Sequence, residues 1–131
     1  MFRPGIDLAQ ISRIRELMEH PRFLLRFFSA AERELFAQKN FSPQTVAANF
    51  AAKEAFSKAL GTGIRGFSLA EVAVLRDELG CPYFQLSGNA RRLVEERGYH
   101  MSVSLTHEQD YAAAVVICEW HGEAFPTTTA R

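Results

Sequence analysis

The sequence predicts an α+β fold: a single compact domain in which a small, mostly antiparallel sheet packs against a long central helix. Residues 101–107 alternate small polar and apolar side chains at a period of two, and the apolar segment 111–118 follows at hairpin distance. Residues 43–60, rich in alanine, are predicted to form the long helix. At 131 residues, the chain lies within the usual range of one domain.

The elements before the central helix are predicted from local signals. Residues 2–6 are expected to form a strand, and the apolar spacing that follows predicts a helix over 9–19. A second helix is expected over 29–38, because Ser29 followed three residues later by Glu32 is the signature of a capping box.

The elements after the central helix are expected to be strands over 71–76 and 83–86, a helix over 89–97, and the hairpin strands 101–107 and 111–119. The domain is expected to cover residues 1–121. The remaining segment, 122–131, is rich in threonine and lacks periodicity, so we expect a flexible tail.

The composition argues against two classes of partner. The formal net charge is zero and no basic stripe is interleaved with aromatic residues, so nucleic acid is not an expected partner. No apolar segment approaches the roughly 20 residues of a membrane span, so a membrane is not expected either. The two cysteines lack metal-ligand spacing and the first residues do not form a secretory leader, which favours a cytoplasmic protein.

The central helix carries a group of polar side chains near its end. Glu54 and Lys58 lie four residues apart and therefore share a helical face, with Lys53 beside them and Ser57 one turn from Lys53. Gly61 is expected to end the helix, because glycine tolerates the positive φ of a C-terminal cap. Such a face can bind an anion or a metal, although a Glu and Lys at this spacing are most often a solvated surface pair.

Two further segments could complete a site. Asp7 ends the first short apolar segment, where it is either the N-cap of the next helix or a metal ligand that needs a second carboxylate such as Glu54. Thr106 and His107 are expected at the mouth of the hairpin, where side chains can reach a ligand, although a single histidine at a strand end is more often structural.

Together these segments resemble the holo-[acyl-carrier-protein] synthase family of phosphopantetheinyl transferases. The family pattern contains an early G-x-D-[IL], a central K-E-A-x-x-K-A-x-G-T-G and a late [ST]-H-x-x-x-[YF]-A-x-A. These motifs occur here within residues 5–14, 49–63 and 104–114, in the same order and with the same spacing. The resemblance covers about residues 5–119.

The resemblance implies Mg²⁺-dependent transfer of the phosphopantetheine arm from coenzyme A to a serine of apo acyl carrier protein, a step that serves fatty acid biosynthesis. It implies that Asp7 and Glu54 are the metal ligands and that Asp7, Glu54 and Lys58 are catalytic. It also implies that coenzyme A is bound by Lys53, Ser57, Lys58, Gly61, Thr106 and His107.

Partner contacts are implied in the same way. The acidic carrier protein would dock on Arg13, Arg22, Phe23 and Arg26, although arginines on such a helix are ordinarily just solvated. Family members are typically trimers, so His107 of one chain would share a site with Asp7 and Glu54 of its neighbour.

Four positions depart from the family pattern. Asn49 stands where a basic residue is usual, Gln10 where an acidic residue is usual, Arg3 where glycine is common, and Cys81 where lysine is common. None of them removes an implied metal ligand. The first two leave open an alternative, a catalytically weakened module that binds a carrier protein and has kept the fold.

Overall fold

A computed structural model describes residues 1–122 of the chain. It contains two antiparallel sheets and five α-helices among these residues. In chain order the elements are β1 (Phe2–Gln10), α1 (Ile11–Met18), α2 (Phe23–Phe27), α3 (Ala30–Gln38), α4 (Pro43–Leu60), the 3-10 helix η1 (Leu69–Glu71), β2 (Val72–Arg76), β3 (Pro82–Leu86), α5 (Gly88–Glu96), β4 (His100–His107) and β5 (Tyr111–Glu119). The predicted fold class is confirmed.

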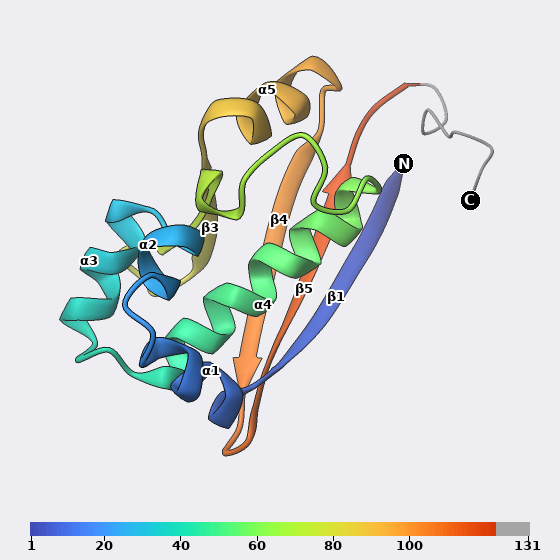
Figure 1. Cartoon of the computed structure of the whole chain (residues 1–131). Helices are drawn as coiled ribbons and strands as arrows, with labels where there is room; N and C mark the ends of the chain where they lie inside the picture. The colour runs from blue at the N-terminus through green and yellow to red at the C-terminus, as the bar shows by residue number, and fades with distance from the viewer. Residues whose placement is uncertain (123–131) are drawn as a thin grey trace.

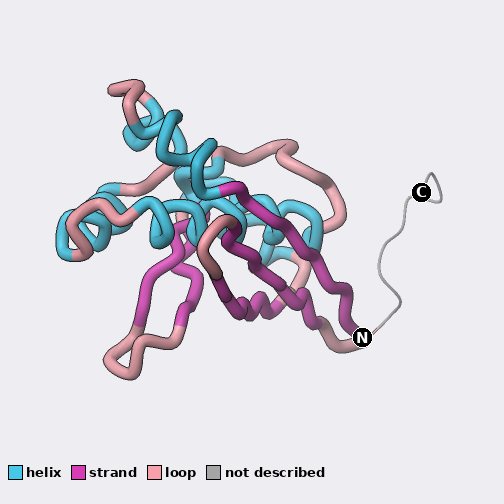
Figure 2. Tube along the Cα trace, turned by 90° about the horizontal axis from the view of Figure 1, so that it is seen from below, coloured by secondary structure: helices cyan, strands magenta, loops and turns pink. Residues whose placement is uncertain are grey.

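The larger sheet has the strand order β1-β5-β4, and α4 lies along it (Figure 1). In its register, Asp7 of β1 and Leu105 of β4 both pair with Ala114 of the middle strand. The β2–β3 hairpin is a separate two-stranded ribbon beside this sheet (Figure 2). The alanine-rich helix therefore lies against the sheet that carries the N-terminal aspartate.

The contact between β1 and α4 depends on Gly5. A Cβ atom at this position would collide with the carbonyl oxygen of Ala55 and would lie 2.5 Å from the backbone nitrogen of Ala59. Small residues on both elements let the two backbones approach closely, because no side chain stands between them. This close approach brings the side chain of Asp7 to the flank of α4.

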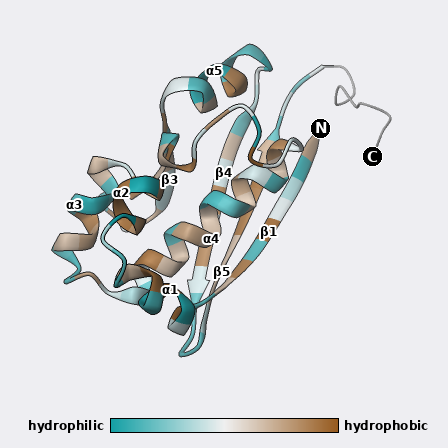
Figure 3. Cartoon of the chain, in the orientation of Figure 1, coloured by the Kyte–Doolittle hydropathy of each residue, from teal (hydrophilic) through white to brown (hydrophobic). Residues whose placement is uncertain are grey.

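The other face of the larger sheet is uncovered in the single chain, and it is apolar along β1 and β5, whereas β4 contributes Ser102, Ser104 and Thr106 to it. Hydrophobic and hydrophilic stretches both occur along β1 (Figure 3), and its large hydrophobic residues fall at the exposed positions of the strand. Phe2, Ile6 and Leu8 are 69%, 68% and 62% exposed, respectively. Exposed apolar side chains that lie together in this way can form a contact with another chain.

An aromatic cluster fixes the helices that precede α4. Phe23 of α2 packs against Phe27, Phe28 and Phe50, with ring centroids 5.6 to 5.9 Å apart. Only 7% of Phe23 is exposed. The sequence did not predict α2, a helix of five residues that is too short to show a period of its own.

Most predicted bounds agree with the structure within two residues, but the N-terminus differs. The first strand continues to Gln10, and this residue is the N-cap of α1 without a side-chain hydrogen bond. Asp7 therefore lies inside a strand, which excludes its alternative role as an N-cap. The expected strand over 71–76 begins one residue later, at Val72, because η1 includes Glu71.

Two other expectations concern the ends of the chain and membranes. Beyond Gly122, the expected tail lies outside the residues that the structure describes. Within residues 1–122, no helix combines the length and the apolar character needed to cross a bilayer.

Candidate active site

The fold brings Asp7, Glu54 and Lys58 together on one flank of α4. Lys58 Nζ donates hydrogen bonds to Asp7 Oδ1 at 3.1 Å and to the carbonyl oxygen of Ile6 at 3.0 Å. Glu54 lies one turn before Lys58 on the same face of the helix. The two carboxylates thus come from elements far apart in the sequence. Asp7 is paired with Lys58, and Glu54 lies within electrostatic reach of both groups.

The surroundings of Glu54 disfavour its charged form. Partial burial raises the pKa of Glu54 above its ordinary value, the negative charge of Asp7 raises it further, and Lys58 opposes both effects. One ammonium group is therefore not enough to neutralise this pair of acids. A divalent cation would relieve the repulsion, so the donor set fits a hard metal ion.

The metal would need ligands besides protein carboxylates. Residues 1–122 contain no group of three or more His, Cys, Asp and Glu side chains that could hold a metal ion. Mg²⁺ suits such a site, because it usually keeps several waters and uses one or two carboxylates together with substrate phosphates. Beside Asp7 lies a pocket of about 190 Å³, lined by Asp7, Leu8, Ala9, Gln10, Arg13, Ile14, Leu17 and Phe50.

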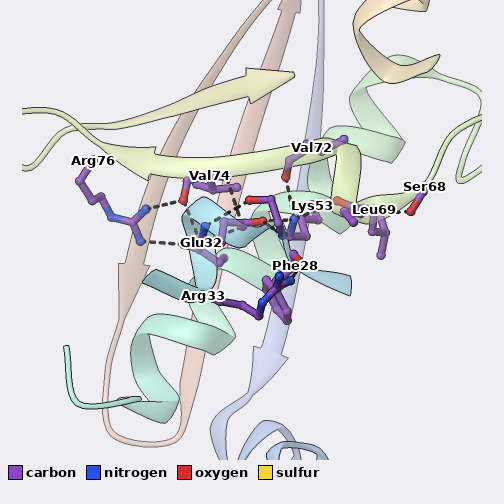
Figure 4. Close-up of polar contacts among 12 residues, drawn as sticks. Phe28, Glu32, Arg33, Lys53, Ser68, Leu69, Val72, Val74 and Arg76 are labelled. Atoms are coloured by element: carbon purple, nitrogen blue, oxygen red, sulfur yellow. Dashed lines mark hydrogen bonds and ion pairs between the residues drawn. The ribbon is translucent and has the colours of Figure 1, made fainter. Parts of the chain in front are cut away.

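The structure contradicts the predicted contact of Lys53 with phosphate. Lys53 is completely buried on another face of α4, where Nζ donates to Glu32 Oε1 at 2.6 Å and to the carbonyl oxygens of Leu69 and Val72 at 2.9 and 2.8 Å (Figure 4). All three ammonium donors are thereby used. Lys53 is therefore a structural residue. It faces the core and not Glu54, because a helical repeat of 3.6 residues turns it about 100° away from its neighbour in the sequence.

Two other predicted contacts are contradicted for the same reason, burial. Ser57 is 2% exposed, and its hydroxyl donates to the carbonyl oxygen of Lys53 at 3.1 Å, one turn earlier. Phe23, predicted to contact the carrier protein, belongs to the aromatic cluster. Its exposed neighbours are Arg22, Leu25 and Arg26, which line a shallow hollow of about 410 Å³. The sequence analysis missed Leu25, whose 63% exposure is not visible from its spacing.

Gly61 and Arg3 form the end of α4. Gly61 has φ +87° and its N–H donates to the carbonyl oxygen of Lys58, so the predicted C-cap is confirmed. Arg3 Nε donates to the carbonyl oxygen of Ala59 at 3.0 Å. A positive group at a helix C-terminus is favourable, which gives this departure from the family pattern a structural role.

His107 lies on the other flank of α4, in a larger cleft of about 620 Å³. Thr45 and Ala48 line this cleft. Thr45 precedes Glu54 by nine residues, a spacing that places the two side chains half a turn apart around the helix axis, on opposite sides of α4. The body of the helix therefore stands between His107 and the Asp7–Glu54 pair of the same chain. The cleft also contains Lys39 and Arg76, which the sequence analysis did not single out, because their charges lie on separate elements.

Thr106 does not share the orientation of His107. Adjacent residues of a strand point to opposite faces, and Thr106 contributes with Ile6 and Val115 to a hollow on the uncovered face of the larger sheet. The structure thus separates three predicted binding elements: the acid pair on one flank of α4, His107 on the other, and Thr106 behind the sheet.

Comparisons with known proteins agree with the resemblance. A family model described as the 4'-phosphopantetheinyl transferase superfamily matches residues 3–116. A holo-[acyl-carrier-protein] synthase of Clostridium botulinum is 43% identical over 116 residues, which cover 88% of this chain and 94% of that protein. One of Treponema denticola is 42% identical over 117 residues, covering 88% and 95%.

Solved structures give the same result. The crystal structure of holo-[acyl-carrier-protein] synthase from Neisseria meningitidis superposes with a TM-score of 0.83 at 35% identity, covering 89% of this chain and 97% of that chain. The Helicobacter pylori enzyme in complex with coenzyme A superposes with a TM-score of 0.78 at 31% identity, covering 88% and 99%.

Proposed function

The chain belongs to the holo-[acyl-carrier-protein] synthase family of phosphopantetheinyl transferases, and we propose that it performs the family's reaction at the Asp7–Glu54–Lys58 cluster with Mg²⁺. It is a transferase that moves phosphopantetheine from coenzyme A to a serine of apo acyl carrier protein. The observation that carries the site assignment is the meeting of two carboxylates and an exposed lysine on one flank of α4.

Asp7 and Glu54 would hold the metal. Bound there, Mg²⁺ would neutralise negative charge that builds on the pyrophosphate of coenzyme A. The raised pKa of Glu54 also suits a group that accepts a proton from the serine hydroxyl of the carrier protein. The serine oxygen forms a bond to the phosphorus that bears pantetheine, the bond from that phosphorus to the adenosine side breaks, and adenosine bisphosphate leaves.

Lys58 would bind the phosphates. Its side chain is 57% exposed while that of Asp7 is 21% exposed, so Lys58 can turn from Asp7 toward a ligand at little cost. A metal held by Asp7 would take over the neutralising role that Lys58 has in the free chain. Lys58 then acts as a point charge on the pyrophosphate.

The carrier protein would dock beside this cluster. Arg13 lines the same pocket as Asp7, which places a cation next to the proposed metal site. Arg22 and Arg26 flank the exposed Leu25 on α2. Arginines around an apolar residue suit an acidic helix that carries an apolar side chain of its own.

A homotrimer would complete the active site. His107 and the Asp7–Glu54 pair lie on opposite flanks of α4, and Thr106 lies on the uncovered face of the larger sheet. Packing this face against a neighbouring subunit would bury Phe2, Ile6 and Leu8. The same packing would let one subunit supply groups to the site of the next.

The first experiment is a mass measurement of apo acyl carrier protein incubated with coenzyme A and Mg²⁺. We expect a mass increase equal to one phosphopantetheine group, abolished by removing the divalent cation with a chelator. Binding of the carrier protein without any mass increase would instead favour the alternative, a module that has lost turnover.

Mixing inactive variants tests the shared site. Under conditions of subunit exchange, His107→Ala and Glu54→Gln proteins should together regain part of the activity, since every mixed trimer contains at least one site built from two unmutated contributions. No recovery, with exchange verified by native mass spectrometry, would place both residues in the site of a single chain. The shared site would also be rejected if the protein sedimented as a monomer and that monomer had full activity.

A further inference from the structure

We infer that Arg76, held in position by Asn49, supplies positive charge for a phosphate group of coenzyme A in the cleft that contains His107. The inference rests on the proposed function, because it assigns this cleft to the coenzyme A nucleotide. Arg76 lies outside the motifs that relate the chain to its family, and Asn49 is one of the positions at which the chain departs from them.

The orientation of Asn49 is fixed by its buried contacts. Asn49 is completely buried on α4, and its Nδ2 donates to Glu32 Oε2 at 3.0 Å and to the carbonyl oxygen of Val74 at 2.9 Å. With both donors used, the amide oxygen must point the other way. Oδ1 accepts a hydrogen bond from Arg76 Nη2 at 2.8 Å.

Arg76 is the link between the buried cluster and the cleft. It extends from the end of β2 beside Glu32 and Val74 (Figure 4), and it also lines the cleft. Its guanidinium donates through Nη1 to the carbonyl oxygens of Val74 and Leu75 at 3.5 and 3.4 Å, and through Nη2 to Asn49. A guanidinium has five N–H donors, and Nε of Arg76 forms no hydrogen bond to any residue within 1–122.

The charge around the cleft points to an anionic ligand. Lys39 and His107 line it together with Arg76, each from a different element. Asp77 and Glu78 also line it, and these two acids are exposed, as are Lys39 and His107, so water screens all four of these side chains. Arg76 is half-buried, so its charge is screened less, and an arginine matches phosphate geometry better than a lysine does.

This arrangement explains how a neutral residue can occupy position 49. A long basic side chain there would reach toward the cleft from α4, whereas Asn49 turns inward and orients a basic side chain from β2. The positive charge is thus kept in the cleft but comes from another element. Asn49 is in this sense a positioning residue.

The test measures Arg76→Gln, Arg76→Lys and the control Arg91→Gln, which removes an exposed arginine from α5. For Arg76→Gln we expect the KM for coenzyme A and the Kd for adenosine 3',5'-bisphosphate by calorimetry to rise about tenfold or more, with kcat at saturation nearly unchanged. Arg76→Lys should lose less, because it keeps the charge. Arg91→Gln should behave as wild type.

Dephospho-coenzyme A identifies the phosphate. If Arg76 contacts the ribose phosphate, Arg76→Gln should leave the KM for dephospho-coenzyme A unchanged. If it contacts the pyrophosphate, Arg76→Gln should raise the KM for coenzyme A and the KM for dephospho-coenzyme A by the same factor. An active wild type whose Arg76→Gln variant keeps its KM and Kd would overturn the inference, while an inactive wild type would overturn the proposed function instead.

The role of Asn49 is tested by a double-mutant cycle. Asn49→Ala should raise the KM for coenzyme A in the wild-type background and have no further effect in Arg76→Gln, because it acts through Arg76. Independent, additive effects would contradict a positioning role. Asn49→Ala also removes a buried partner of Glu32, so its stability is measured by thermal denaturation alongside the kinetics. If this variant does not fold, the Arg76 variants alone decide the proposal.

Discussion

Two clusters of charge lie on different faces of α4 and differ in how completely their members are satisfied. On the buried face, Glu32 accepts hydrogen bonds from Lys53, Asn49 and the N–H groups of Ser29 and Val74. Every donor of Lys53 has an acceptor. On the other face, the exposed Lys58 pairs with Asp7 alone, and the pKa of the nearby Glu54 is raised.

The comparison teaches how to tell a structural ion cluster from a functional one. A buried charge is tolerated only when hydrogen bonds and an opposite charge compensate its desolvation. The buried cluster meets this condition with protein groups alone. The Asp7–Glu54–Lys58 cluster does not. Its remaining negative charge can bind a metal ion, and a metal ion together with Lys58 can then bind a phosphate group.

Breaking the buried cluster should have the largest effect. Lys53→Met removes the partner of a completely buried carboxylate, so we expect the free energy of unfolding to fall by about 3–5 kcal/mol in urea denaturation. The control is the pair of changes Glu32→Gln and Lys53→Met, which removes both charges and should cost less than the sum of the single variants. A loss below about 1 kcal/mol for Lys53→Met would contradict the structural role.

Breaking the other cluster should abolish activity and leave the fold intact. Glu54→Gln keeps side-chain size and helix propensity while removing a proposed metal ligand, so we expect kcat/KM to fall by about 100-fold or more, or about 3 kcal/mol of transition-state stabilisation. Asp7→Asn should behave similarly. Circular dichroism checks the fold, and turnover like that of the wild type would refute the site assignment.

Gly5 affects only the Asp7–Glu54–Lys58 cluster, because it allows the close approach of β1 to α4 that positions Asp7. Gly5→Ala forces β1 away from α4, so we expect a loss of about 2 kcal/mol in unfolding free energy and a fall in activity, because Asp7 moves relative to Glu54. Gly98→Ala is the contrasting variant: no atom lies within 4 Å of its built Cβ, but its φ of +65° strains an alanine, so it should lose about 1–2 kcal/mol of stability and keep its activity. A fully stable and active Gly5→Ala protein would show that the close approach is unnecessary.

The smallest effect concerns pH. Because the pKa of Glu54 is raised in the folded chain, the stability that its protonated form contributes is complete below its unfolded pKa and is lost as pH rises through the folded value. Without metal at neutral pH, Glu54→Gln should therefore raise Tm by about 1–2 °C, and the gain should vanish near pH 4. Scanning calorimetry at both pH values measures this.

Adding Mg²⁺ should reverse the order of the two Tm values, so that the wild type becomes more stable than Glu54→Gln. A metal that binds only the folded protein raises its Tm, so Mg²⁺ should stabilise the wild type and leave Glu54→Gln unchanged. Equal stabilisation of both proteins would show that the ion binds elsewhere.

Local signals in the sequence predicted a large part of the fold. The bounds of α4 and β5 agree with the predicted ranges, and the capping box of Ser29 and Glu32 is present. The helix α2 was missed because five residues carry too little periodicity. The continuation of β1 to Gln10 was missed because pairing with β5, a distant segment, decides it.

The sequence by itself determined which residue types occur at which spacing, and this was enough to predict the fold class, to place Glu54 and Lys58 on one helical face, and to suggest Asp7 as their partner. It could not determine which of two adjacent charges faces the core. Lys53 and Glu54 differ by about 100° around the helix, and only the positions of Glu32, β2 and β1 decide that one is buried and the other meets Asp7. The burial of a charge depends on partners that are distant in the chain, so tertiary structure alone decided this, as it decided that Asn49 points inward and Arg76 lines the cleft.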